Sequence, residues 1–233
     1  IMATLLLRLA APLQSWGMDS KFETRKTNRE PTKSGIIGLL SAALGLRRDE
    51  TEEIEKLNQL RFAVRVDREG SLLIDYHTAG NSLPWKSFKQ TYVTQRHYLC
   101  DAVFLVGLES DDSAWLEQLE EALRRPAFPL FLGRRSCPPT QPLCLGICPL
   151  DLLEALRHEP PLVPVQNRTE PRTFRICTDA EPGNAESVPV RDLPISFSPI
   201  HRQYGYRAVR EIVTEEPSVL PGETAHDPFT ELG

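Results

Sequence analysis

The chain has 233 residues and a mass of 26.3 kDa, so it can form one large domain or two small ones. Hydrophobic residues make up 40% of it and charged residues 25%, an ordinary globular composition that argues against long disorder except at the C-terminus. No run of about 18 apolar residues could span a membrane, and the apolar stretch near the N-terminus is too short for a signal peptide. We therefore expect a cytoplasmic protein without a membrane partner.

The net charge of −5 is distributed unevenly. Residues 1–100 carry 15 Lys and Arg against 11 Asp and Glu, whereas residues 101–233 carry 12 against 21. The last segment, 211–233, holds six acidic residues and no Lys or Arg. This balance excludes a general nucleic-acid coat but permits a local basic groove, because charges are screened within about 8 Å at physiological salt.

The five cysteines are Cys100, Cys137, Cys144, Cys148 and Cys177. Their odd number and irregular spacing do not indicate a disulfide framework. No Cys-x-x-Cys pair is present and no histidine lies close to Cys137, Cys144 and Cys148, so these three fit a zinc site poorly. We expect reduced, partly buried thiols, no metal and no cofactor.

The first predicted elements are a strand and two helices. Residues 4–9 form an apolar run that predicts a buried strand. A helix follows, with Thr32 as its N-cap and Gly45 at its C-terminal cap. A second helix is predicted from Asp49, which together with Glu52 has the spacing of a capping box.

The middle of the chain predicts a hairpin, a polar excursion and a strand. Residues 62–67 and 72–77 alternate in polarity around a short turn, which is typical of a β-hairpin. Residues 78–96 are a polar excursion, and an excursion this long inside a domain is usually functional. Residues 99–108 predict one further strand.

The remaining predicted elements are a helix over 112–125, a strand over 143–147, a short helix over 150–157, and strands over 172–177 and 188–198. With the helix that starts at Asp49 set aside, the order is close to the βαββαβ arrangement of ferredoxin-like (RRM-like) folds. We therefore predict an α+β fold with an appended β-rich C-terminal part.

Several common catalytic motifs are absent from the sequence. It contains no Walker A motif, no GxGxxG after a strand, no HExxH and no GxSxG. Their absence favours a binding protein over a metabolic enzyme.

Four segments concentrate positive charge. Segment 21–33 carries five Lys or Arg and ends at a predicted helix N-terminus, where Lys33 and Ser34 would add a cation and a hydroxyl to an anion site. Segment 76–100 has no acidic residue and interleaves three cations with aromatic residues that could stack on unpaired bases. Segments 132–138 and 200–210 add an Arg-Arg pair and further cations. The alternatives are a solvated basic loop and aromatic side chains that fold back into the core.

These segments carry a resemblance to a known family. Residues 5–17 (LLLRLAAPLQSWG), 31–40 (PTKSGIIGLL) and 132–138 (LGRRSCP), together with the His201-Arg202 region, resemble the CasD subunits of type I-E CRISPR Cascade complexes, in the RAMP superfamily. The resemblance implies one ferredoxin-like domain over 2–210 with a β-hairpin thumb inserted at about 77–98. The acidic tail 211–233 lies outside it and is expected to be flexible.

The resemblance also implies a function. It implies a non-catalytic subunit that caps the 5′ handle of the CRISPR RNA, contacts the adjacent backbone and large subunits, and meets target DNA through the assembled complex. The residues expected to bind RNA are Gln14, Trp16, Arg25, Lys26, Arg29, Lys33, Ser34, Lys86, Lys89, Arg96, Arg134, Arg135, Ser136, His201 and Arg202.

A second hypothesis is a metal-independent endoribonuclease that processes CRISPR repeat RNA, because a protein of a related subtype has this activity. Such cleavage needs a base for the 2′-hydroxyl and an acid for the leaving oxygen. The candidates are His77, His97, Tyr98, His201 and Lys33. The histidines are few and dispersed in the sequence, which favours the non-catalytic hypothesis.

Overall fold

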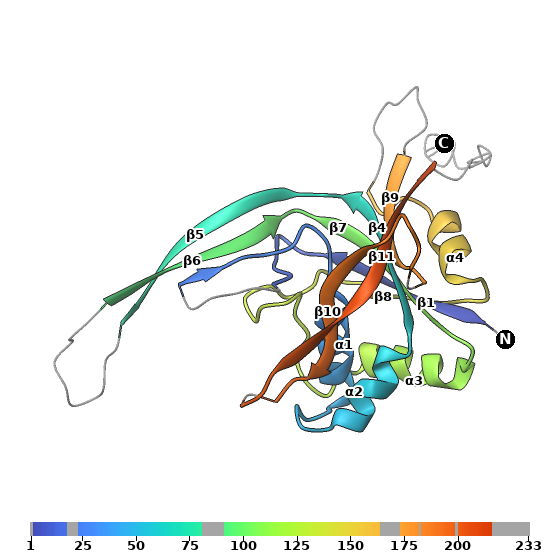
Figure 1. The fold of residues 1–233 in the computed structure, drawn as a ribbon, viewed down its shortest axis with the longest axis horizontal. Helices are drawn as coiled ribbons and strands as arrows, with labels where there is room; N and C mark the ends of the chain where they lie inside the picture. The colour runs from blue at the N-terminus through green and yellow to red at the C-terminus, as the bar shows by residue number, and fades with distance from the viewer. Residues whose placement is uncertain are drawn as a thin grey trace, which may run out of the picture.

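The computed structural model describes residues 2–17, 23–80, 91–163, 173–181, 183–198 and 200–215. Its main feature is a seven-stranded sheet with the order β10-β11-β9-β4-β7-β1-β8, in which each neighbouring pair is antiparallel (Figure 1). The strands are β1 (Ala3–Ala10), β4 (Arg61–Arg68), β7 (Val103–Ser110), β8 (Cys144–Cys148), β9 (Thr173–Asp179), β10 (Val188–Ser196) and β11 (Gln203–Glu215). The appended C-terminal strands therefore extend the same sheet beyond β4.

Helices cover both faces of this sheet. The main core lies between the sheet and two helices, α1 (Lys33–Leu44) and α3 (Ser113–Arg124), and includes Leu5, Leu7 and Leu9 of β1. The opposite face packs Leu6 against α4 (Leu152–His158). Successive side chains of a strand point to opposite faces, so burial on both sides explains why β1 is a continuous apolar run.

Local capping signals set most helix ends. The Thr32 hydroxyl accepts the N–H of Gly35 at the start of α1, and Gly45 ends that helix in the left-handed region with φ 78°. The Asp112 carboxylate caps α3 in the same way. The capping box predicted at Asp49 is wrong: α2 (Thr51–Asn58) starts two residues later, and its N-cap makes no side-chain capping bond.

The predicted hairpin over 62–77 is also wrong. β4 pairs with β7 and β9, while β5 (Ser71–Gly80) pairs along its full length with β6 (Thr91–Cys100) in a second sheet. Both edges of β4 are already occupied by neighbours within the large sheet, so β5 leaves it. The predicted strand over 99–108 is two strands, because the chain changes sheet at Asp101, which has φ 56°.

The β5–β6 hairpin is a long curved arm that projects from the body of the molecule (Figure 1). We call it the thumb. It begins at Ser71 rather than near residue 77, and residues 81–90 at its far end lie outside the described residues. Two short strands, β2 (Leu13–Gln14) and β3 (Thr24–Arg25), pair with the other edge of β6. The thumb is thereby connected to the segment that follows β1.

The C-terminal strand β11 was not predicted. It runs to Glu215 and pairs with β9 and β10, so the first five residues of the expected tail belong to the sheet. Residues 216–233 lie outside the described residues. Within the described ranges, no helix is both long enough and apolar enough to cross a membrane.

Candidate RNA-binding surface

Basic side chains meet where β3 runs beside β6 at the root of the thumb. Arg25 of β3 is the register partner of Arg96 of β6, and the exposed Lys26 follows it. The loop after residue 132 brings Arg134 and the exposed Arg135 to the same place, since Arg134 Nη2 donates to the carbonyl of Arg25 at 2.8 Å. We call these five residues the basic surface. Three separate segments of the predicted cationic sequence thus come together.

An aromatic side chain supports this surface. The guanidinium of Arg134 lies over the ring of Tyr98, 4.7 Å from its centroid. The Tyr98 hydroxyl is 3.5 Å from the hydroxyl of Ser136. Burial disfavours the Tyr98 phenolate, but the hydrogen bond with Ser136 and the Arg134 guanidinium outweigh burial and lower the pKa of Tyr98. Tyr98 is buried, so it serves as a platform for Arg134 and not as a base-stacking ring.

Two guanidinium N–H groups of the basic surface are buried and find no acceptor among the described residues. They are Arg96 Nε and Arg134 Nη1. A buried donor without a partner costs about 1–3 kcal/mol, and more when the group is charged. A phosphate oxygen is the acceptor that suits a guanidinium best, because the pair is charge-assisted and can be bidentate. The arrangement is therefore suited to binding an anion.

The loop that carries Arg134 is held against the segment after β1. Ser15 N–H donates to the carbonyl of Leu132 at 3.1 Å. Gly133 has φ 86°, and a Cβ at this position would overlap the carbonyl oxygen of Ser15. Only glycine permits both the backbone conformation and the close approach. Gly133 therefore places the adjacent arginines on the basic surface.

Gln14 and Trp16 have a structural position and do not lie on the surface. The Gln14 amide donates to the carbonyls of Leu9 and Ala102, and its oxygen accepts the indole N–H of Trp16 at 3.2 Å. The Trp16 ring packs on Gly35 of α1, where a Cβ would lie only 2.8 Å from a ring carbon. The Gln-Ser-Trp-Gly and Pro-Thr-Lys-Ser-Gly motifs thus occur together because they pack together.

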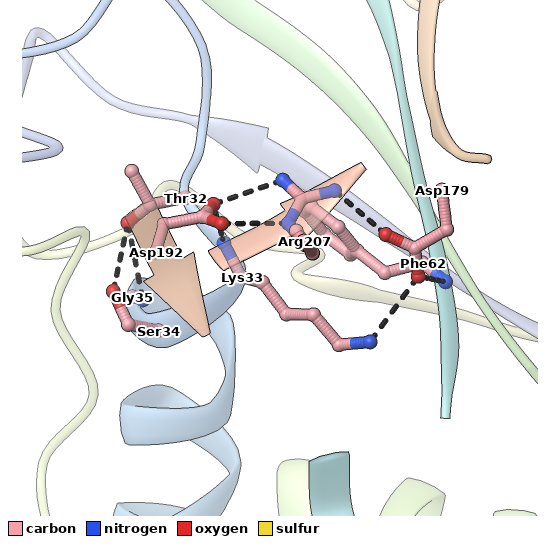
Figure 2. A network of polar contacts seen from close by, with 8 residues as sticks. All are labelled: Thr32, Lys33, Ser34, Gly35, Phe62, Asp179, Asp192 and Arg207. Carbon is pink, nitrogen blue, oxygen red and sulfur yellow. Dashed lines mark hydrogen bonds and ion pairs between the residues drawn. The ribbon is translucent and has the colours of Figure 1, made fainter. Parts of the chain in front are cut away.

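Lys33 is part of a buried ionic network (Figure 2). Its side chain is 8% exposed, and its Nζ pairs with Asp179 at 3.2 Å. Its backbone N–H donates to Asp192 at 2.8 Å, and Arg207 pairs with both aspartates. Burial is the main reason that the pKa of Lys33 is lowered. A carboxylate of the chain itself therefore lies at the helix N-terminus that the sequence suggested for an external anion.

The other predicted residues lie in several places. Ser34 is buried with its hydroxyl near that of Thr32, and Arg29 is exposed before α1. His201 and Arg202 are exposed in the turn between β10 and β11. Lys86 and Lys89 lie outside the described residues.

Sequence reasoning missed the acidic partners in the ionic network. Asp179 and Asp192 are 146 and 159 residues from Lys33, so no local pattern could pair them with it. Across the described part of the chain, no group of three or more His, Cys, Asp or Glu could hold a metal ion.

Comparison with known proteins identifies the family. A family model described as "CRISPR-associated protein (Cas_Cas5)" matches residues 4–210. The chain belongs to the CRISPR-associated Cas5 family. This Cas5 family member is 44% identical over 158 residues to the CRISPR system Cascade subunit CasD of Escherichia coli (strain K12), an alignment that covers 62% of this chain and 70% of CasD. The predicted resemblance to CasD is confirmed.

Solved structures agree with this assignment. A chain of a CRISPR RNA-guided surveillance complex matches with a TM-score of 0.79 and 34% identity, covering 93% of this Cas5 chain and 92% of the other. A second match, described as a crystal structure of a Cas protein, has a TM-score of 0.71 and 40% identity and covers 91% and 95% of the two chains. The mixed α and β architecture is shared with both.

Proposed function

We propose that this protein is a non-catalytic RNA-binding subunit of a type I-E Cascade complex and that it caps the 5′ handle of the CRISPR RNA. The observation that carries the proposal is the pair of buried guanidinium donors on Arg96 and Arg134, which have no acceptor in the part of the chain that the structure describes and lie within the basic surface. The family and the CasD relative supply the biological context. The chain as a whole is negatively charged, so the cluster of cations cannot be explained by a generally basic composition. This supports a specific role for the basic surface in binding an anion.

The fold supports the same proposal. β1, α1, β4, β7, α3 and β8 follow one another as βαββαβ, and their strands lie side by side in the order β4-β7-β1-β8. We infer from this order a ferredoxin-like core, with α2 added after α1 and the thumb inserted between β4 and β7. The basic surface lies at the point where the thumb joins this core, so RNA bound there would be in reach of both.

Exposed apolar residues of the thumb support the proposal that this protein contacts neighbouring subunits. Leu72, Ile74, Tyr76 and Val93 are exposed, and their register places all four on one face of the hairpin. The opposite face carries Arg96, which belongs to the basic surface. We therefore propose that the apolar face of the thumb meets the adjacent backbone or large subunit while the other face meets RNA. This subunit would meet target DNA only through the assembled complex.

The four histidines within the described residues are poorly arranged for RNA cleavage. His77 pairs in register with Thr94, and His97 pairs with Ile74, so the two rings project from opposite faces of the thumb about 10 Å apart along the strand. His158 and His201 come from α4 and from the β10–β11 turn. A general acid and a general base must act on the same phosphodiester. This dispersal supports the non-catalytic proposal over the endoribonuclease.

We also propose a cytoplasmic location without a membrane partner. The five cysteines are free thiols, in keeping with a reducing compartment.

The test is RNA binding as a function of salt. The double variant Lys26→Gln, Arg135→Gln removes two exposed cations of the basic surface and breaks no described contact. We expect weaker binding of a repeat-derived RNA by fluorescence anisotropy, and a slope of log K against log salt that is smaller by about 1.4, because two counterion-releasing contacts are lost. The matched control is Arg48→Gln, Arg157→Gln, which removes two exposed arginines near α2 and in α4. Equal effects of the two double variants would contradict the proposal.

A further inference from the structure

Arg175 of β9 lies among three carboxylates. Its Nη2 is 2.6 Å from Glu30 and 3.2 Å from Glu69, and its Nη1 is 3.2 Å from Glu211. Its side chain is 24% exposed, so it is largely buried beneath them. Lysine could not make the same set of contacts, because the planar guanidinium directs donors along fixed and separate directions.

The three carboxylates belong to three different parts of the molecule. Glu30 ends the segment 23–30, which holds Arg25 and Lys26. Glu69 lies in the turn between β4 and β5, where the thumb leaves the sheet. Glu211 belongs to β11, which pairs with β9 and fixes the sheet on which Arg175 is mounted. The Arg175 side chain thus connects the segment 23–30 and the root of the thumb, which both carry residues of the basic surface or lie next to it, to the C-terminal strands.

Within the described residues, other contacts hold the segment 23–30 and the thumb root to their near neighbours. The segment 23–30 is held by two hydrogen bonds with the backbone of Trp16, in which Asn28 N–H donates to its carbonyl and the Thr27 hydroxyl accepts its N–H. The bond from Arg134 to the Arg25 carbonyl and the short pairing with β6 add to these contacts. The thumb is held at its root by Arg68, whose Nε donates to the carbonyl of Asp101. The ion pairs of Arg175 add a link from both the segment and the thumb root to the C-terminal strands.

We propose that Arg175 is a positioning residue that sets the basic segment 23–30 and the thumb root relative to each other, without contacting RNA itself. The proposal rests on the proposed RNA-binding function. Burial alone would lower the pKa of Arg175, but Glu30 and Glu211 outweigh burial and raise it, so the guanidinium stays charged. Three carboxylates already neutralise the charge of Arg175, so no net positive charge remains at this place to attract a phosphate.

The experiment compares Arg175→Gln, Arg175→Lys and the control Arg124→Gln, which removes an exposed ion pair of α3. We expect Arg175→Gln to weaken binding of the repeat-derived RNA about fivefold while the salt slope stays that of the wild type, because no RNA contact is lost. Arg175→Lys should recover part of the affinity, and Arg124→Gln should change nothing. A reduced salt slope in Arg175→Gln would mean that Arg175 contacts RNA and would overturn the proposal, as would unchanged affinity.

A second readout separates this proposal from the RNA-binding function. Backbone amides of residues 26–30 and 69–72 should exchange hydrogen faster in Arg175→Gln than in the wild type, whereas amides of α3 should not. If the wild type fails to bind RNA, the proposed function is wrong, and the exchange experiment still decides the role of Arg175. Should Arg175→Gln not fold, Glu30→Gln, Glu69→Gln removes the same two connections and leaves the buried guanidinium with Glu211. Unchanged exchange in the folded variant would refute the positioning role.

Discussion

Asp192 of β10 accepts the backbone N–H of Lys33 at the first turn of α1. The same carboxylate receives Arg207 Nε at 2.6 Å and Nη2 at 2.9 Å, and it is 1% exposed. Arg207 reaches onward to Asp179, which also accepts the backbone N–H of Phe62 in β4. These contacts make Asp192 the point at which the C-terminal strands are fastened to the helical side of the core (Figure 2).

Replacement of Asp192 should therefore destabilise the fold. We expect Asp192→Ala to lower the free energy of unfolding by about 3 kcal/mol, because it leaves Arg207 buried with one partner fewer and removes the acceptor of the buried Lys33 backbone N–H. Urea denaturation measures this. The control Asp49→Ala, at an exposed position, should stay within about 0.5 kcal/mol of the wild type. A similarly small loss in Asp192→Ala would show that the network contributes little.

Gly133 and Gly183 give a matched pair for a second prediction. Both have a positive φ, at 86° and 88°, but a Cβ meets the Ser15 carbonyl only at Gly133 and finds nothing within 4 Å at Gly183. Gly183→Ala should cost about 1 kcal/mol from backbone strain alone. Gly133→Ala should cost more than about 3 kcal/mol, or displace the loop and weaken RNA binding. Equal melting temperatures and RNA affinities of the two variants would contradict the close approach.

The apolar face of the thumb predicts a separation of stability from assembly. Ile74→Thr, Tyr76→Thr should leave the melting temperature nearly unchanged, because both side chains are exposed in the isolated chain. The same variant should be recovered less well with the other subunits in a co-purification of the complex. Val213→Thr, at another exposed apolar position of a strand, is the control and should assemble normally. Normal assembly of the thumb variant would argue against a partner on this face.

Cys177 predicts a pH dependence in alkali. Burial, helped by the nearby charge of Glu30, raises the pKa of Cys177 to about 11 from its ordinary value of 9.0. The unfolded chain loses this proton first, so the stability contribution of the thiol is full below pH 9.0 and is lost as the pH rises toward about 11. The difference in unfolding free energy between wild type and Cys177→Ala should shrink across this window. Taking the difference removes the contribution of Lys33, whose lowered pKa acts in the opposite direction. A constant difference would mean that the thiol is not shielded.

The proposal that this protein is not a nuclease is directly testable. Wild-type protein incubated with repeat RNA in a chelator should leave the RNA intact on a denaturing gel. General acid–base groups contribute about 10²–10⁴-fold in rate, so a true nuclease would lose most activity when one residue is replaced. Cleavage by the wild type that disappears in His77→Ala, His97→Ala or His201→Ala would favour the endoribonuclease.

Elements with strong local signals could be predicted from the sequence. The buried run of β1, the Thr32 cap with the apolar face of α1, and the Asp112 cap of α3 each depend on residues a few positions apart. The predicted hairpin over 62–77 failed because two strands separated by a short turn look alike whether they pair with each other or enter different sheets. That choice depends on β7 and β9, which are distant in sequence.

The residues of the candidate site also differ in how far the sequence could predict their roles. Arg25, Lys26, Arg134 and Arg135 could be found from charge, because clustered cationic residues can be recognised in the sequence without knowing their partners. Lys33 looked the same in the sequence, yet its role is decided by aspartates on β9 and β10. Strand β11 escaped prediction because it is only partly buried and its side chains mix Tyr, Arg and Glu with few apolar residues.

The chain segments just before and just after the thumb are paired with each other in the large sheet. Arg68, the last residue of β4, is the register partner of Val103, the first residue of β7. The polypeptide therefore leaves and re-enters the sheet at adjacent positions, and the strand order on either side does not depend on what lies between them. A hairpin of another length or sequence could replace the outer part of the thumb, beyond the buried Tyr98 and Leu99, while the seven strands keep their registers.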